Sequence, residues 1–281
     1  MLSTYYKLIK PGIVGANAMT AIAGFLFASV APFDWQAFVG MTIGLTLMLA
    51  SSCIANNYID RFIDSKMKRT KNRPLVTGQV SALHALVVSI VMGLAGLAIL
   101  VLYTNILTVI VGIFGFVSYV GIYGYVKRKS YLGTAVGTLP GGASIVAGYV
   151  TSTGTFDRST LVLLIVMAVW QMAHFYAIAI FRKDEYKSAG IPVISVVKGI
   201  PTTKNHIIFY TILFIPSIVI LKVVSDLSIV AYLLLLAISF WWIKVTLSDR
   251  SHFKWAQRAF GGSLVVLTIF SIIISIDGLF R

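Results

Sequence analysis

The chain has 281 residues, of which 58% are hydrophobic and 11% are charged. Soluble domains carry about 25% charged residues, disordered chains have few apolar residues, and disulfide scaffolds need several cysteines. The composition therefore excludes all three classes, because apolar residues dominate and Cys53 is the single cysteine. The net charge of +14 lies mainly between long apolar runs, so nucleic acid is not an expected partner.

Nine apolar runs are long enough to cross a bilayer as helices, which takes about 20 residues each. No Ser-, Gly- or Pro-rich linker divides them, so we predict an all-α polytopic membrane protein with a single domain over residues 1–281. Two connections, 60–80 and 182–206, are long, and we expect them to be ordered caps over the cytoplasmic face. The runs lie at residues 11–31, 37–59, 81–103, 106–126, 131–151, 159–181, 207–224, 227–246 and 259–276.

Basic residues divide unequally when the connections are assigned alternately to the two sides. Arg158, Lys222 and Arg281 fall on one side, and every other Lys and Arg, Arg250 among them, falls on the other. Short basic loops stay in the cytoplasm. We therefore predict a cytoplasmic N-terminus, an external C-terminus and a multi-pass location in the bacterial inner (cytoplasmic) membrane.

The second apolar run ends in a polar segment in which Asn56, Asp60 and Asp64 stand four residues apart. On a helix they form one stripe about 12 Å long. Carboxylates beside water and phosphate suit Mg²⁺, and the guanidinium groups of Arg69 and Arg73, also four apart, suit phosphate oxygens. The spacing predicts a Mg²⁺-diphosphate site. An ordinary charge-balanced helix end is the alternative, but it leaves the amide of Asn56 inside the run unexplained.

The sixth apolar run ends in a second polar segment. Gln171, His174 and Arg182 share one helical face, although the first two lie inside the run. A single histidine on an apolar helix is more often a hydrogen-bonded structural residue than a ligand. The amide of Gln171 on the same face gives the structural and the ligand interpretations of His174 equal weight. The candidate substrate-binding residues of this segment are Gln171, His174, Arg182, Lys183 and Tyr186.

Two further features have both a structural and a functional interpretation. The cluster Lys127-Arg128-Lys129 is either a determinant of membrane orientation or a clamp for phosphate, so Lys127 and Arg128 are also candidate substrate-binding residues. The glycine-rich fifth run, which begins at Gly133, is typical of close helix packing, and it could also make room for an apolar ligand.

The run Asn56-x3-Asp60-x3-Asp64-x2-Met67-x-Arg69-Thr70-x2-Arg73-Pro74 resembles the first motif of the intramembrane prenyltransferase superfamily, which includes ubiquinone and menaquinone prenyltransferases. Trp170-Gln171-x2-His174 and Tyr186-x2-Ala189-Gly190-Ile191-Pro192 resemble the second signature of the branch that acts on haem. The resemblance covers nearly the whole chain. It implies transfer of a farnesyl group from farnesyl diphosphate to a vinyl group of haem b within the lipid bilayer, with water added to give haem O.

The resemblance also implies residue roles. Asp60 and Asp64 would hold Mg²⁺, Asn56 would support them, and Arg69 and Arg73 would bind the diphosphate on the cytoplasmic side. A downstream haem-modifying enzyme or a terminal oxidase would receive the product. Aromatic side chains at inner span ends could face the allylic cation, and the candidates are Tyr58, Tyr123, Tyr125, Phe175 and Tyr176.

One position departs from the pattern of the superfamily. Quinone-type members carry a second Asp-x3-Asp motif, whereas the residue four after Asp184 is Ser188 in this chain. The adjacent pair Asp184 and Glu185 is left as the candidate for a second metal.

Two other functions compete with haem farnesylation. A prenyltransferase acting on a quinone precursor or another aromatic acceptor would keep the first motif but has no evident need of His174. A polytopic membrane transporter would also explain the apolar runs. Transport pathways place ionisable groups near the bilayer midplane, whereas nearly all charges of this chain lie at the ends of the runs.

Overall fold

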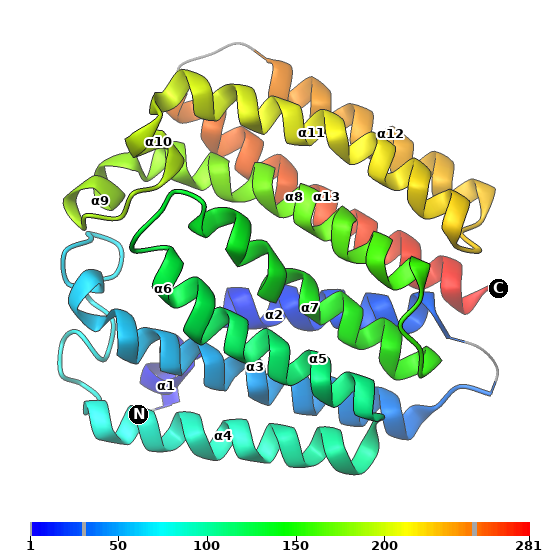
Figure 1. Ribbon diagram of the computed structural model, residues 1–281, viewed down its shortest axis with the longest axis horizontal. Coiled ribbons are helices and arrows are strands. Elements are labelled where there is room, and N and C mark those ends of the chain that lie inside the picture. The colour runs from blue at the N-terminus through cyan, green and yellow to red at the C-terminus, as the bar shows by residue number, and fades with distance from the viewer. Residues whose placement is uncertain (1, 30–31, 249–251) are drawn as a thin grey trace.

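The computed structural model describes residues 2–29, 32–248 and 252–281, which form a bundle of long helices lying side by side (Figure 1). No strand occurs in these ranges, so the prediction of an all-α protein is confirmed. Arg250 lies outside the described residues. The helices are α1 Leu2–Leu8, α2 Pro11–Phe27, α3 Trp35–Asp64, α4 Ala82–Tyr103, α5 Ile106–Val117, η1 Ser118–Tyr123, α6 Gly124–Val126, α7 Gly133–Thr153, α8 Arg158–Phe181, α9 Lys183–Ser188, α10 Ile194–Val197, α11 Gly199–Val224, α12 Ile229–Leu247 and α13 His252–Leu279.

Seven helical segments of the described chain are long and apolar enough to cross a membrane. They are α3, α4, the continuous helix Ile106–Val126 that joins α5, η1 and α6, and α8, α11, α12 and α13. Helix α2 has 17 residues and is shorter than these seven, α7 is not among them, and both lie in the same bundle. The chain is therefore a multi-pass membrane protein. The count of nine spans and the orientation of the two ends stay predictions.

Helices α3, α11 and α13 extend well beyond the apolar runs that predict them, which are 37–59, 207–224 and 259–276. Helix α3 begins after Asp34, whose side chain accepts a hydrogen bond from the backbone N–H of Ala37 at 2.9 Å, and it continues to Asp64. Helix α11 begins at Gly199 instead of residue 207, with Pro201 in its first turn, where the missing N–H is not needed. Backbone hydrogen bonding continues past the end of an apolar run. Hydropathy alone therefore underestimates the length of such helices.

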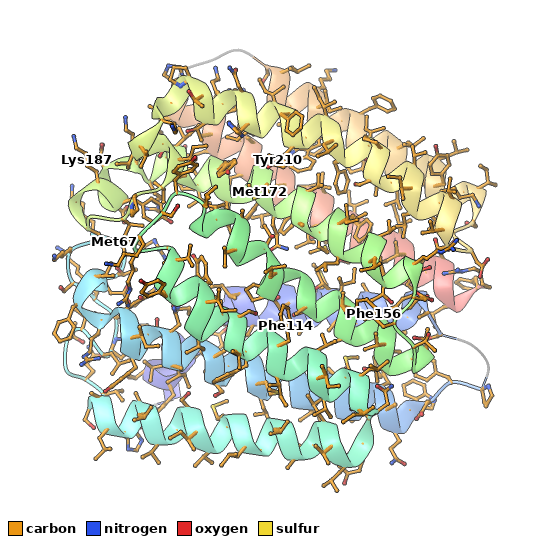
Figure 2. The ribbon with its side chains drawn as sticks, in the orientation of Figure 1. Met67, Phe114, Phe156, Met172, Lys187 and Tyr210 are labelled. Carbon is orange, nitrogen blue, oxygen red and sulfur yellow. The ribbon has the colours of Figure 1, made fainter. Side chains whose placement is uncertain are left out.

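The two long connections are ordered and meet at one end of the bundle. Met67 and Lys187 lie at that end, and Phe156 lies at the opposite end (Figure 2). The buried side chain of Met67 packs against Ala189 and Ile191. The hydroxyl of Ser188 donates a hydrogen bond to the carbonyl of Lys66 at 3.3 Å. Both connections are ordered and cap one end of the bundle, as predicted, and their location on the cytoplasmic face stays a prediction.

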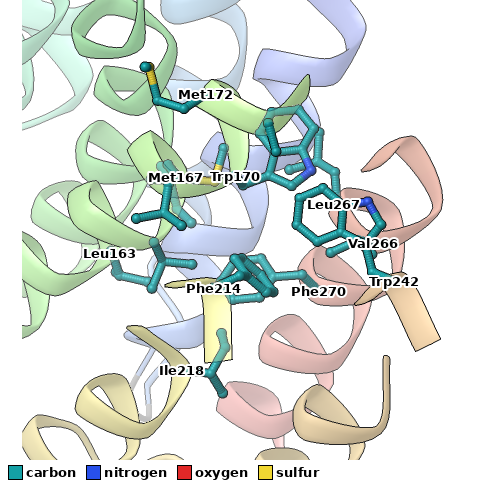
Figure 3. Close-up of a cluster of buried hydrophobic side chains, with 14 of the residues drawn as sticks. Leu163, Met167, Trp170, Met172, Phe214, Ile218, Trp242, Val266, Leu267 and Phe270 are labelled. Atoms are coloured by element: carbon teal, nitrogen blue, oxygen red, sulfur yellow. The ribbon is translucent and has the colours of Figure 1, made fainter. Parts of the chain in front are cut away.

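The largest hydrophobic cluster is formed by residues of α8, α11, α12 and α13 together with residues of α2 and α7. Trp170, Phe214, Trp242 and Phe270 are buried there, one from each of the first four helices (Figure 3). The ring centroids of Phe214 and Trp242 are 5.5 Å apart in an edge-to-face arrangement. Because lipid is as apolar as these side chains, close packing and not removal from water holds such helices together.

Candidate active site

A cavity of about 600 Å³ lies at the end of the bundle where the two long connections meet. We call it the polar cavity. The five residues of the predicted Mg²⁺-diphosphate site all line it, so the structure brings together what the spacing predicts. These residues are Asn56, Asp60, Asp64, Arg69 and Arg73.

Arg73 is held against the end of α3. Its guanidinium Nη1 lies 2.5 Å from Oδ2 of Asp64 and donates a second hydrogen bond to Oδ1 of Asn57 at 3.1 Å. The intervening turn is fixed because the hydroxyl of Thr70 donates to the carbonyl of Asp64 at 2.8 Å. Asp64 is buried, so the guanidinium supplies the opposite charge that a buried carboxylate requires.

The basic cluster after α6 pairs with the acidic stripe. Lys127 Nζ forms an ion pair with Oδ2 of Asp60, and Arg128 Nη2 donates to Oδ1 of the same carboxylate at 2.7 Å. Arg128 also donates to the carbonyl of Ile59 at 3.0 Å. Burial lowers the pKa of Lys127, although the carboxylate of Asp60 opposes that shift. Lys127 lines the polar cavity, whereas Arg128 supports Asp60 from outside its wall.

Lys10, the residue before α2, is a third basic group in the wall. Its Nζ donates to Oδ1 of Asn56 at 2.8 Å. Desolvation, together with the positive charges of Arg73 and Lys127, lowers the pKa of Lys10 to about 8. The other end of the same amide, Nδ2 of Asn56, is buried without a hydrogen-bond partner among the described residues. A donor left without a partner beside cationic groups fits an anionic ligand.

The carboxylates fit Mg²⁺ better than a metal that prefers many protein ligands. Asp60 and Asp64 lie one helical turn apart, and both line the polar cavity. Within the described chain, no cluster of three or more His, Cys, Asp or Glu side chains could hold a metal. Mg²⁺ takes one or two carboxylates and completes its shell with water and substrate phosphates. The donor set therefore suits Mg²⁺ carried with a diphosphate.

The segment after α8 contributes only part of its predicted residues. Arg182 and Tyr186 line the polar cavity, and burial raises the pKa of Tyr186. Arg182 also pairs with Oε1 of Glu185 at 2.7 Å. Lys183 and Asp184 do not line the cavity, and Asp184 is exposed. The structure does not bring the pair at 184 and 185 to the carboxylates of α3, and a second metal there stays a prediction.

A second cavity, of about 590 Å³, adjoins the first and has a mainly apolar wall. We call it the apolar cavity. Both Gln171 and His174 line it, and neither lines the polar cavity. The side chains common to both walls mark the junction between the cavities. They are Ile13, Tyr119, Tyr123, Phe175, Ile178 and Phe260.

The π-helical turn η1 carries two of the junction residues. The rings of Tyr119 and Tyr123 stack with their centroids 5.8 Å apart, and Lys127 Nζ lies 5.0 Å from the centre of the Tyr123 ring. Single π-turns inside α-helices often occur at functional sites. Of the aromatic residues predicted to face a cation, Tyr123 and Phe175 line the cavities. Tyr58, Tyr125 and Tyr176 line neither.

Several residues of the site were not predicted to belong to it, and three of them make contacts that shape it. Lys10 was interpreted only as a determinant of orientation, and no spacing relates it to Asn56. Asn57 lies beside the predicted stripe, and its Nδ2 donates to the carbonyl of Leu8 at 2.8 Å. Tyr119 lines both cavities because the π-turn places it there, and the sequence gives no sign of that turn.

A helical membrane bundle with buried carboxylates and cations at one end, next to an apolar cavity, is typical of membrane-embedded enzymes that act on prenyl diphosphates. A family model, described as the UbiA prenyltransferase family, matches residues 17–268. The chain belongs to the UbiA prenyltransferase family. The prediction of an intramembrane prenyltransferase is confirmed, and the family decides against the transporter.

Relatives support this membership, and solved structures share the fold. A protein of Photorhabdus laumondii named Protoheme IX farnesyltransferase is 42% identical, over 99% of this chain and 96% of its own length. A protein of Yersinia pseudotuberculosis with the same name is 41% identical, over 99% and 95%. A solved digeranylgeranylglyceryl phosphate synthase matches with a TM-score of 0.81 at 16% identity, over 100% and 99% of the two chains. A UbiA homologue from Archaeoglobus fulgidus bound to GPP and Mg²⁺ matches with a TM-score of 0.71 at 16% identity, over 97% and 99%.

Proposed function

We propose that this chain transfers a farnesyl group from farnesyl diphosphate to a vinyl group of haem b, with addition of water, to give haem O and diphosphate. The observation that carries the proposal is the polar cavity, where the carboxylates of Asp60 and Asp64 meet five cationic side chains beside an apolar cavity. Those side chains are Lys10, Arg69, Arg73, Lys127 and Arg182. The names of the relatives at 42% and 41% identity support haem b as the acceptor.

In this proposal the carboxylates of Asp60 and Asp64 hold Mg²⁺ on the diphosphate. Bound Mg²⁺ stabilises the negative charge that builds on the departing diphosphate. The Archaeoglobus fulgidus homologue bound to GPP and Mg²⁺ supports this cofactor. Arg69 and Arg73 bind diphosphate oxygens, because guanidinium groups match them in charge and geometry.

The remaining residues of the polar cavity orient these groups. Lys127 and Arg128 hold the carboxylate of Asp60 in place through the ion pairs described above. Asn56 turns its free Nδ2 to a diphosphate oxygen while its Oδ1 accepts from Lys10. Donors that are already fixed in place stabilise the charge that develops in the transition state without having to move first. This preorganisation is the main source of electrostatic catalysis. Arg182, Lys183 and Tyr186 remain candidates for further contacts with the substrate.

In the reaction the C1–O bond of farnesyl diphosphate, the π bond of the vinyl group and one O–H bond of water break, and one C–C bond and one C–O bond form. The bond between C1 of the farnesyl group and the diphosphate oxygen breaks, and its electron pair leaves with the diphosphate. The outer carbon of the vinyl group bonds to C1, and the positive charge moves to the carbon beside the porphyrin ring. Water adds to that carbon and releases one proton. The stacked rings of Tyr119 and Tyr123 face the junction where the cation forms, and their π systems stabilise it.

The site lies at the end of the bundle that carries most of the basic residues, including the cluster at residues 127–129. We therefore place it on the cytoplasmic side of the inner membrane. A haem-modifying enzyme or a terminal oxidase in the same membrane would take up the product.

An acceptor comparison tests the proposal. Purified protein in lipid nanodiscs is incubated with Mg²⁺, farnesyl diphosphate labelled in its farnesyl group, and either haem b or an aromatic quinone precursor. We expect label on haem b alone, and none when EDTA replaces Mg²⁺. Transfer to the quinone precursor without transfer to haem b would overturn the proposed acceptor and leave the family membership intact.

A further inference from the structure

His174 and Ser263 form a hydrogen bond in the wall of the apolar cavity. Nδ1 of His174 lies 2.7 Å from Oγ of Ser263, which is on α13, and both side chains are buried. Helix α8 is joined to the same residue a second time, because Nε1 of Trp170 donates to the carbonyl of Ser263 at 2.8 Å. Two of the three signature residues of α8, Trp170 and His174, are therefore hydrogen-bonded to Ser263 of α13.

The hydroxyl of Ser263 determines which nitrogen of His174 carries the proton. This hydroxyl donates to the carbonyl of Phe260 at 2.6 Å. A hydroxyl has one hydrogen, so Oγ can only accept from His174. Nδ1 of His174 must therefore carry a hydrogen, and in the neutral imidazole Nε2 carries the lone pair.

His174 lines the apolar cavity, and its Nε2 has no hydrogen-bond partner among the described residues. The ring itself is held by aromatic neighbours. The centroid of Trp170 lies 4.9 Å away at 25°, and the centroid of Phe260 lies 4.8 Å away at 37°. A fixed imidazole with one free lone pair in an apolar wall has the chemistry of a metal ligand.

We propose that Ser263 is a positioning residue, which fixes the Nδ1–H tautomer of His174 so that Nε2 ligates the iron of haem b. This inference rests on the proposed function, because the iron is brought by the substrate. A hydrogen bond at the second ring nitrogen sets the orientation and basicity of a ligating histidine. The arrangement thereby orients one edge of the porphyrin toward the junction with the polar cavity.

Iron ligation explains the location of His174 better than proton transfer does. A base for the water that adds to the vinyl carbon would have to lie at the junction, where the cation forms. His174 lies in the apolar cavity only, while Phe175 and Ile178, on the same helix, reach both cavities. The imidazole is therefore in a position to contact the iron at the centre of a porphyrin, while the edge of the same porphyrin reaches the junction.

The first test measures the tautomer directly in the whole protein. Nitrogen NMR of ¹⁵N-histidine-labelled protein in nanodiscs separates protonated from unprotonated ring nitrogens, and His174→Gln identifies the signals among the four histidines. We expect a protonated Nδ1 and an unprotonated Nε2 at neutral pH. An Nε2–H tautomer in the wild-type protein would overturn the proposal without any variant of Ser263.

The second test measures haem b binding by absorption spectroscopy. In Ser263→Ala we expect affinity for haem b to fall on the order of 10- to 100-fold, as for other partners of metal-ligating histidines, and the haem spectrum to shift. Ser263→Thr keeps the hydroxyl and should restore both. Ser271→Ala is the matched control, because Ser271 is a buried serine of the same helix whose hydroxyl has no partner among the described residues. We expect it to leave the spectrum unchanged.

The outcomes separate this inference from the proposed function. If the wild-type protein farnesylates haem b and His174→Gln has the same haem spectrum as wild type, iron ligation is wrong and the proposed function stands. If haem b neither binds nor reacts, the proposed function and iron ligation both fail. Equal spectra for Ser263→Ala and Ser271→Ala, with the shift present in His174→Gln, would remove Ser263 from its positioning role.

Discussion

Lys127 and Asp60 form an ion pair although 67 residues separate them in the chain. The pair joins the connection after α6 to the polar end of α3. Asp60 and Asp64 each have a cationic partner, which holds both carboxylates in place at the wall of the polar cavity. Carboxylate oxygens in fixed positions are what binding of Mg²⁺ requires.

We predict that Asp60→Asn or Asp64→Asn lowers kcat by at least about 100-fold, because electrostatic stabilisation of a leaving group is typically worth that much. The measurement is haem product formation at saturating substrates and limiting Mg²⁺. Asp34→Asn is the matched control, since Asp34 caps α3 and asparagine caps a helix equally well. Normal turnover in either site variant would contradict the assignment of that carboxylate to the metal.

The amine of Lys10 predicts a pH dependence. Its pKa is lowered to about 8, so it is charged below that pH and neutral above it. Because kcat/KM follows groups of the free enzyme, we expect kcat/KM for farnesyl diphosphate to fall as pH rises through about 8. Lys10→Arg keeps the charge at all these pH values and should move the fall to higher pH. Superimposable profiles for the two proteins would show that another group titrates.

Close packing of α2 against α7 predicts a contrast between two glycines of one helix. A Cβ at Gly24 would lie 2.1 Å from the carbonyl oxygen of Ile145, whereas a Cβ at Gly15 meets nothing within 4 Å. We predict that Gly24→Ala destabilises the fold by about 1–3 kcal/mol. Gly15→Ala should stabilise it by about 0.5–1 kcal/mol. Thermal unfolding in detergent measures both, and equal midpoints would contradict the close approach.

The orientation of the site predicts which loops an impermeant reagent reaches. Lys129 and Thr155 are exposed at opposite ends of the bundle, and Cys53 is buried. In a Cys53→Ser background, we expect Thr155→Cys to be labelled in intact spheroplasts and Lys129→Cys only after the membrane is opened. Labelling in the reverse order would place the polar cavity on the outer side.

The sequence was sufficient for features that depend on one helix. Apolar runs predict the spanning helices because each must satisfy its own backbone hydrogen bonds in lipid. The stripe of Asn56, Asp60 and Asp64 was predictable because residues four apart lie on the same face of a helix. The run 182–206 was less predictable, since polar residues begin α11 before the apolar run does.

Contacts between distant residues could not be predicted from spacing. Lys10 meets Asn56 across 46 residues, and His174 meets Ser263 across 89. Each depends on how α2 or α13 packs against its neighbours, and many serines and lysines of the chain could have filled these places. The role of Lys127 was unpredictable for the same reason. In the sequence, a basic cluster at this place is explained equally well as a determinant of membrane orientation, and only the structure shows Lys127 beside Asp60.

The most direct test of the proposed function is the mass of the haem product. Purified protein in nanodiscs is incubated with haem b, farnesyl diphosphate and Mg²⁺ in water enriched in ¹⁸O, and the extracted haem is analysed by mass spectrometry. We predict a haem that has gained one farnesyl group and one hydroxyl group, with the labelled oxygen in the hydroxyl. Haem b recovered unchanged, under conditions in which the protein releases diphosphate from farnesyl diphosphate, would contradict the proposed reaction.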